Sequence, residues 1–303
     1  MNSIVNPNFL IPGASRSGTT SLYHYLRDHP EIFMPENKEV RYFDRNDRYC
    51  DKEWYFEHFE SVTDETAIGE SSPPYFYESI VRDESGEYQG LTDNSITARV
   101  LGFNSDMKIV ISLRDPVNRA YSQYWKNRNN RNIDDDKSFR KVIEEEINQK
   151  RTPEETPACW LYKNKYSIHL KPWFENFPDD QIKIIIFDEW IQEPESILEE
   201  ICEFLEVDSS YDFSDVLDEE KNSSKIYKSK LLKYAYRKNP LLKYVYRNHV
   251  LDTRLENLVK KFTHQDGYPD MSEETREFVY SQLEDDIEET EEILGRDLDV
   301  WKP

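Results

Sequence analysis

The stretch "FLIPGASRSGTTSLYHYL", residues 9–26, constrains the fold more than any other part of the sequence. An apolar run at Phe9–Ile11 leads into a turn bounded by Gly13 and Gly18, and apolar residues then recur at helical spacing. A glycine-containing turn between a strand and a helix places backbone N–H groups around an anion. The stretch therefore predicts a phosphate-binding loop in a protein that combines helices and strands.

The loop departs from the Walker A pattern of nucleoside triphosphatases. Gly13, Gly18 and Thr20 match that pattern, but Thr19 occupies the lysine position and the nearest cation is Arg16. No apolar run ends in a convincing Walker B aspartate. Two interpretations stay open on these residues: a site for an anion other than a nucleoside triphosphate, and a plain Gly-Ser turn.

Four apolar stretches predict buried strands. They are Phe9–Ile11, Ala67–Gly69, Lys108–Leu113 and Ile182–Phe187. Helical patterns follow the last two at Val117–Asn129 and Pro194–Leu205, and another helix is predicted from Ser272 to a stop at Gly295. Strands that alternate with helices indicate a parallel sheet covered on both faces. We expect an α/β fold, a P-loop-type three-layer sandwich with a central parallel sheet flanked by helices, formed by one domain over residues 1–303.

A second motif, "IVISLRDPVNRAYSQYW", occupies residues 109–125. Arg114 stands at the carboxyl end of a predicted strand, and Ser122 lies inside the helix that follows. An arginine and a hydroxyl placed in this way can clamp a second phosphate through charge-assisted hydrogen bonds. The other interpretation is a capped helix with surface arginines.

The bulk composition excludes some partners. The chain of 303 residues carries a net charge of −22, so its field repels nucleic acid. Cys50, Cys159 and Cys202 lack the spacing of a zinc site or a disulfide framework. The first ten residues lack the features of a signal peptide, and no run reaches the roughly 20 apolar residues of a membrane-spanning helix. We expect a soluble, cytoplasmic protein.

Together, the motifs resemble a known family. "PGASRSGTTSL" and "SLRDPVNRAYSQY" are similar to the 5′- and 3′-phosphate motifs of sulfotransferases that use 3′-phosphoadenylyl sulfate (PAPS). "NKEVRYFD", residues 37–44, resembles the K-E-x-x-F-F-D segment of the heparan sulfate branch. "IGESSPPYF" resembles that branch's E-K-x-x-x-Y-F stretch, with Ser71 at the lysine position. The resemblance runs from Asn8 to Trp301. It implies PAPS as donor, no metal, and a hydroxyl acceptor on a carbohydrate or glycolipid.

The resemblance also implies roles for individual residues. Those expected to bind the donor are Arg16, Ser17, Gly18, Thr19, Thr20, Arg114, Ser122, Lys225 and Lys228. Glu39 matches the family's catalytic glutamate, which accepts the proton of the acceptor hydroxyl. Arg16 stands where the family has lysine; it can stabilise charge on the leaving phosphate but cannot donate a proton near neutral pH. Lys38, Arg41 and Glu70 are expected at the acceptor, and Glu70 is also the nearest rival to Glu39 as the base.

A basic segment stands out from this acidic chain. Residues 225–249 contain eight lysines and arginines and no Asp or Glu, with tyrosines and leucines between them. In the family, a loop near this point closes over the 3′-phosphate and adenine, which implies the roles of Lys225 and Lys228. For residues 230–249 two interpretations stay open: contact with an anionic glycan or membrane surface, and a solvated helix pair.

Two rival functions also stay open. One is a nucleotide kinase or nucleoside triphosphatase, which needs a phosphate lysine and Mg²⁺ ligands that the loop does not supply. The other is a non-catalytic module that binds PAPS or a glycan, in which Arg16 in place of lysine marks lost activity.

Overall fold

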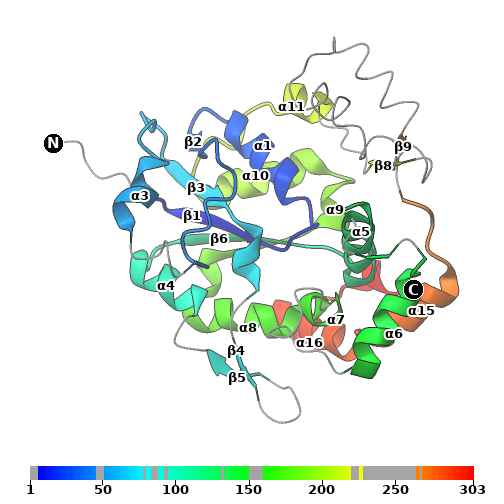
Figure 1. Cartoon of the computed structure of the whole chain (residues 1–303). Coiled ribbons are helices and arrows are strands. Elements are labelled where there is room, and N and C mark those ends of the chain that lie inside the picture. Colours follow the sequence, from blue (N-terminus) through cyan, green and yellow to red (C-terminus); the bar gives the residue numbers. More distant parts are fainter. Residues whose placement is uncertain are drawn as a thin grey trace, which may run out of the picture.

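The structure is a computed structural model in which helices cover both faces of one central sheet (Figure 1). It describes residues 6–45, 51–77, 80–82, 88–91, 95–130, 133–134, 136–149, 160–219, 225–227, 264–266 and 268–303. Among these residues, no helix is both long enough and apolar enough to cross a membrane.

The central sheet has five strands in the order β2-β3-β1-β6-β7, and every neighbouring pair is parallel. The strands are β1 (Phe9–Gly13), β2 (Ile32–Phe33), β3 (Ala67–Ser71), β6 (Lys108–Leu113) and β7 (Ile182–Ile186). This confirms the predicted α/β fold with its central parallel sheet. The prediction missed β2, because two residues are too short to give a periodic signal, and it extended β7 by one residue.

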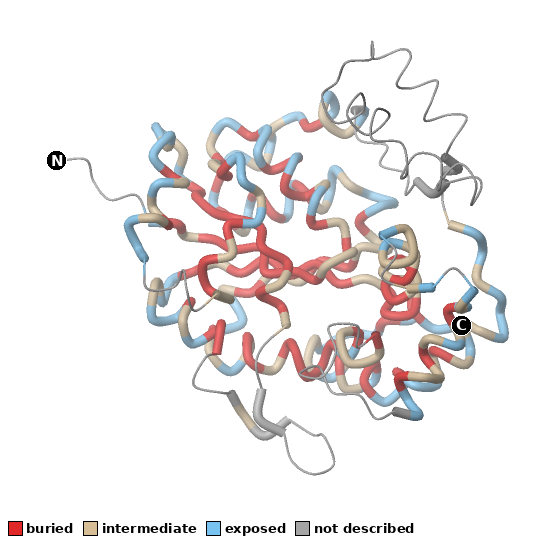
Figure 2. Tube along the Cα trace, in the orientation of Figure 1, coloured by how far each residue is buried: buried red, intermediate tan, exposed pale blue. Residues whose placement is uncertain are grey.

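Alternating side chains of the strands pack against two separate layers of helices. Phe9, Ile11 and Val110 belong to a hydrophobic cluster with α1 (Thr19–Asp28) and α10 (Pro194–Leu205) on one face. Leu10, Ile109 and Ile111 belong to the cluster on the other face. Its helices are α4 (Ile96–Phe103), α5 (Pro116–Asn129), α8 (Tyr166–Asn176) and α16 (Glu284–Leu294). Figure 2 shows that the buried residues concentrate along the sheet and these packed faces.

The remaining elements surround this three-layer body. They are α3 (Lys52–Glu57), η1 (Pro73–Phe76), β4 (Ile80–Arg82), β5 (Tyr88–Leu91), α6 (Phe139–Gln149), α7 (Trp160–Asn164), η2 (Asp179–Gln181), α9 (Phe187–Trp190), α11 (Ser214–Glu219), β8 (Lys225–Tyr227), β9 (His264–Asp266), α15 (Glu273–Tyr280) and η3 (Asp299–Trp301). β4 pairs with β5 and β8 pairs with β9, both antiparallel.

The C-terminal region forms two helices where the sequence pattern predicts one. α15 begins after the cap Ser272 and ends at Tyr280. α16 begins at Glu284 and ends at Leu294, and the next residue, Gly295, adopts a left-handed φ of 62°. Val279 and Leu283 are both buried in the same cluster on either side of the turn. The apolar spacing continues across the turn, so a pattern of buried positions could not reveal it.

Candidate active site

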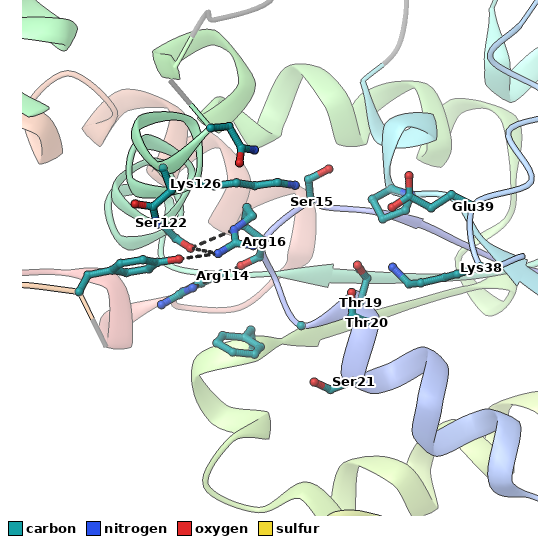
Figure 3. Close-up of a pocket in the computed structure, with 16 residues that line it drawn as sticks. Ser15, Arg16, Thr19, Thr20, Ser21, Lys38, Glu39, Arg114, Ser122 and Lys126 are labelled. Carbon is teal, nitrogen blue, oxygen red and sulfur yellow. Dashed lines mark hydrogen bonds between the residues drawn. The ribbon is translucent and has the colours of Figure 1, made fainter. Parts of the chain in front are cut away.

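A cavity of about 670 Å³ opens where β1 and β6 end (Figure 3). The carboxyl ends of parallel strands are the usual place for ligands in such sheets. The residues that line the cavity are Ser15, Arg16, Gly18, Thr19, Thr20, Ser21, Lys38, Glu39, Pro73, Arg114, Ser122, Lys126, Asn129, Asn130, Phe187 and Tyr268. It therefore brings together Arg114 and Ser122 of the second predicted phosphate motif, the first two charged residues of "NKEVRYFD", and six residues of the first predicted phosphate motif, among them Arg16, Gly18, Thr19 and Thr20.

The loop between β1 and α1 depends on glycine at its last position. Gly18 has a left-handed φ of 80° at the start of α1. A Cβ atom there would lie 2.3 Å from the ring of Trp190 and 2.6 Å from that of Phe187. Only glycine fits this close approach without displacing the rings, and α1 can therefore direct its first N–H groups at the cavity.

Three consecutive carbonyl groups of the loop are bound by side chains. Arg119 Nε donates to Ser15 O at 2.8 Å, Arg114 donates to Arg16 O at 3.3 Å, and Ser112 Oγ donates to Ser17 O at 2.5 Å. These side chains bind the carbonyl oxygens, which are the negative ends of the loop's peptide dipoles, so those oxygens need no other donor. The loop is thus arranged to receive an anion.

The side chain of Arg16 lies against the helix that carries the second motif. Its Nε and one terminal nitrogen donate to Ser122 Oγ at 3.0 and 2.8 Å, and the same terminal nitrogen donates to Tyr268 Oη at 2.8 Å. Figure 3 shows the guanidinium turned toward Ser122 and away from Glu39. As placed, Arg16 belongs to the predicted 3′-phosphate site, and its expected role at the leaving phosphate stays a prediction.

Arg114 lines the same cavity as Arg16 and Ser122. Its guanidinium carbon lies 5.0 Å from the centre of the Phe187 ring, and burial lowers its pKa while Asp188 opposes that shift. The Nε atom is buried and has no hydrogen-bond partner among the described residues. A buried donor without an acceptor costs free energy unless a ligand supplies one, so Arg114 has bonding capacity for an anion.

Lys38 and Glu39 line the opposite side of the cavity. Figure 3 shows Lys38 extending toward Thr19 and Thr20 at the start of α1. Burial lowers the pKa of Lys38 to about 8, although the neighbouring Glu39 raises it. Glu39 is exposed to solvent and faces the cavity, as a proton acceptor for an incoming hydroxyl must be.

A second, smaller cavity of about 230 Å³ adjoins the first and shares Ser15, Glu39 and Lys126 with it. Its other lining includes the aromatic residues Tyr77 and Trp160. Glu39 thus lies between a cavity lined by residues of the two predicted phosphate motifs and one lined in part by aromatic and amide side chains. This arrangement suits a carboxylate that acts between a donor and an acceptor.

Sequence reasoning missed several residues of the site. Lys126 lines both cavities and lies one helical turn after Ser122, and that spacing could have identified it. Tyr268 gave no such signal, because it lies 252 residues from its partner Arg16. Phe187, predicted as part of a strand, begins α9 and places its ring beside Arg114.

The structure places three predicted site residues away from the cavity. The guanidinium of Arg41 is tied to Asp44, with Nε 2.9 Å from Oδ2. Ser17 is fully buried, so its side chain does not line the cavity. Glu70, expected at the acceptor and as a rival base, is also fully buried. Burial raises the pKa of Glu70 to about 7, while bonds from neighbouring hydroxyls oppose the shift.

The basic segment is described only in part. Lys225 begins β8, whose backbone lies beside α5, the helix that carries Ser122 (Figure 1). Lys228 and residues 230–249 lie outside the described residues, so their predicted roles stay predictions.

The aspartate after β7 is engaged within the protein. Asp188 Oδ2 accepts a hydrogen bond from the backbone N–H of Asp115 at 2.7 Å and another from Trp301 Nε1 at 3.1 Å. Asp115 in turn caps α5 and pairs with Arg276 at 2.8 Å. This geometry explains Asp188 as a support for the second phosphate motif.

The fold and the cavity define an α/β protein in which two predicted phosphate motifs meet at one end of a parallel sheet. Residues 6–291 match the family model of the sulfotransferase domain, and the chain belongs to that family. A solved structure, the sulfotransferase from Alicyclobacillus acidocaldarius, has the same fold, with a TM-score of 0.67 at 24% identity. The match covers 99% of this chain and 100% of that one.

Two curated relatives of this chain are named as heparan sulfate sulfotransferases. A bifunctional heparan sulfate N-deacetylase/N-sulfotransferase of Drosophila melanogaster is 30% identical over 224 residues, 70% of this chain and 20% of the relative. Mouse heparan sulfate glucosamine 3-O-sulfotransferase 5 is 27% identical over 205 residues, 66% of this chain and 53% of the relative. The matched part therefore spans between a fifth and about half of these relatives.

Proposed function

We propose that this protein transfers the sulfuryl group of PAPS to a hydroxyl group of a carbohydrate. The observation that carries the proposal is the cavity in which two phosphate motifs face one exposed carboxylate, Glu39. Family membership supports sulfuryl transfer, and the names of the relatives support a glycan acceptor.

The residues of the cavity fit PAPS. The 5′-phosphosulfate would be held by the loop after β1 and by Thr19 and Thr20, and the 3′-phosphate by Arg16, Arg114 and Ser122. The buried Nε of Arg114, which has no hydrogen-bond partner among the described residues, favours an anion at this position. When bound, PAPS supplies an activated sulfuryl group and a phosphate leaving group.

The chain's own residues would then carry out three tasks. Glu39 accepts the proton of the acceptor hydroxyl. Lys38 and Lys126 border the cavity on either side of Ser15 and would stabilise negative charge that develops on the sulfuryl oxygens. The loop and the Ser122 cluster hold the donor in line with the acceptor, which supplies the positioning that group transfer requires.

The rival kinase or nucleoside triphosphatase receives less support from the same residues. Thr19 holds the lysine position, and Asp188, which follows β7, is bonded to Asp115 and Trp301. Sulfuryl transfer requires neither a Walker lysine nor a Walker B aspartate.

The nucleotide assignment predicts a preference between two ligands. The protein should bind adenosine 3′,5′-bisphosphate (PAP) at least about tenfold more tightly than AMP, because each charge-assisted contact with the 3′-phosphate is worth roughly 1.5–3 kcal/mol. Isothermal calorimetry with both ligands measures the difference. Equal affinity would show that Arg16, Arg114 and Ser122 hold no 3′-phosphate.

A further inference from the structure

Glu70, the next-to-last residue of β3, is a fully buried carboxylate that accepts hydrogen bonds from three hydroxyl groups. Its Oε1 accepts hydrogen bonds from Tyr55 Oη at 3.1 Å and Tyr75 Oη at 2.9 Å. Its Oε2 accepts one from Ser72 Oγ at 2.6 Å. Because a buried carboxylate with these bonds cannot meet a substrate hydroxyl, its role must be exerted through its partners.

Two of these hydroxyl groups, those of Ser72 and Tyr75, also accept hydrogen bonds from the backbone that follows Glu39. Ser72 Oγ accepts from the N–H of Arg41 at 3.1 Å. Tyr75 Oη accepts from the N–H of Tyr42 at 2.6 Å and from that of Phe43 at 3.2 Å. A hydroxyl has one proton, so a hydroxyl that donates to Glu70 presents its oxygen lone pairs to the amides.

The residue directly after Glu39 is bonded to the carboxylate itself, because the backbone of Val40 donates a hydrogen bond to Glu70. Four consecutive amides, those of residues 40–43, are thus bonded either to Glu70 or to a hydroxyl that donates to it. Residues 39–42 lie in neither helix nor strand, so they lack the regular backbone bonds that would otherwise fix them.

We propose that Glu70 is a positioning residue that anchors the backbone of residues 40–43 through Ser72 and Tyr75 and thereby directs the Glu39 carboxylate into the cavity. The catalytic part of this inference rests on the proposed function. A carboxylate that acts as the base in group transfer must be held in a fixed position, since a displacement of about 1 Å can cost roughly 10²-fold in rate.

Two tyrosines provide a matched test, because both donate to the same oxygen of Glu70. Tyr75 also accepts hydrogen bonds from the amides of Tyr42 and Phe43, whereas the hydroxyl of Tyr55, among the described residues, bonds to Glu70 alone. Both side chains are fully buried. Replacement by phenylalanine keeps each ring and removes one hydroxyl.

The experiment compares Tyr75→Phe and Tyr55→Phe with the unchanged protein. Hydrogen exchange of the amides of Tyr42 and Phe43 should accelerate at least about tenfold in Tyr75→Phe and stay within about twofold in Tyr55→Phe. Turnover with radiolabelled PAPS and chemically desulfated heparan sulfate should fall about 10–100-fold in Tyr75→Phe alone, with PAP affinity retained in both variants.

Equal exchange and equal turnover in the two variants would overturn the positioning role, because loss of a stabilising bond to Glu70 alone would affect both alike. If Tyr75→Phe fails to fold, Ser72→Ala tests the bond that links Glu70 to the backbone of Arg41 through Ser72. Hydrogen exchange of the Arg41 amide should then accelerate. Absence of transfer by the unchanged protein would reject the proposed function instead, while the exchange measurement would still decide whether residues 40–43 are anchored.

Discussion

Glu39→Gln should lower turnover by roughly 10²–10⁴-fold and leave PAP affinity almost unchanged. An alcohol is a weak nucleophile at neutral pH, so a group within reach must accept its proton as the new bond forms. Glutamine keeps the shape of the side chain and removes its basicity. Glu39 is the exposed carboxylate shared by the two cavities, and steady-state rates with calorimetric PAP binding would measure the two effects separately.

Glu36→Gln is the matched control for this prediction. Glu36 is an exposed carboxylate three residues earlier, outside both cavities, where it lies 3.8 Å from Arg27. Its replacement changes the net charge equally and should leave turnover within about twofold, because a surface ion pair contributes little. A Glu39→Gln enzyme as active as the Glu36→Gln enzyme would remove Glu39 from the mechanism.

Arg16→Ala should weaken PAP binding by about ten- to hundredfold and change AMP binding much less. The reason is the position of the guanidinium, which donates two hydrogen bonds to Ser122 in the predicted 3′-phosphate site. Calorimetry with PAP and AMP on the variant and the unchanged protein gives the four affinities needed.

The same variant separates two roles for Arg16. If the side chain instead acts on the leaving phosphate, as the family's lysine implies, turnover will fall while the ratio of PAP to AMP affinity stays unchanged. Arg16→Lys keeps the charge and loses the paired contact with Ser122. Arg16→Lys should therefore recover part of the lost PAP affinity if Arg16 binds the 3′-phosphate. It should recover most of the turnover if Arg16 acts on the leaving phosphate.

The sequence predicted those parts of the fold and site that depend on neighbouring residues. β-branched runs identified β6 and β7, and the glycine spacing identified the loop whose last glycine approaches Trp190 and Phe187. Arg114 and Ser122 follow one strand in a single motif, so their shared place at the cavity was also predictable.

Long-range packing determined what the sequence could not predict. Tyr268 reaches Arg16 from the far end of the chain, and nothing in its local sequence indicates that contact. Glu70 follows a predicted strand in the same way as Arg114 does, yet the structure places it within β3, where its side chain is fully buried. The burial of that carboxylate depends on Tyr55 and Tyr75, whose positions only the folded chain defines.

The most direct test of the central claim is transfer of radiolabelled sulfate from PAPS by the unchanged protein. Chemically desulfated heparan sulfate and a mixture of glycolipids would be offered as acceptors, and PAP release would be measured alongside. We predict label in the carbohydrate and an equal amount of PAP. Tight PAP binding with no label in any acceptor would contradict the account, and would identify the protein as a module that binds PAPS without transferring its sulfuryl group.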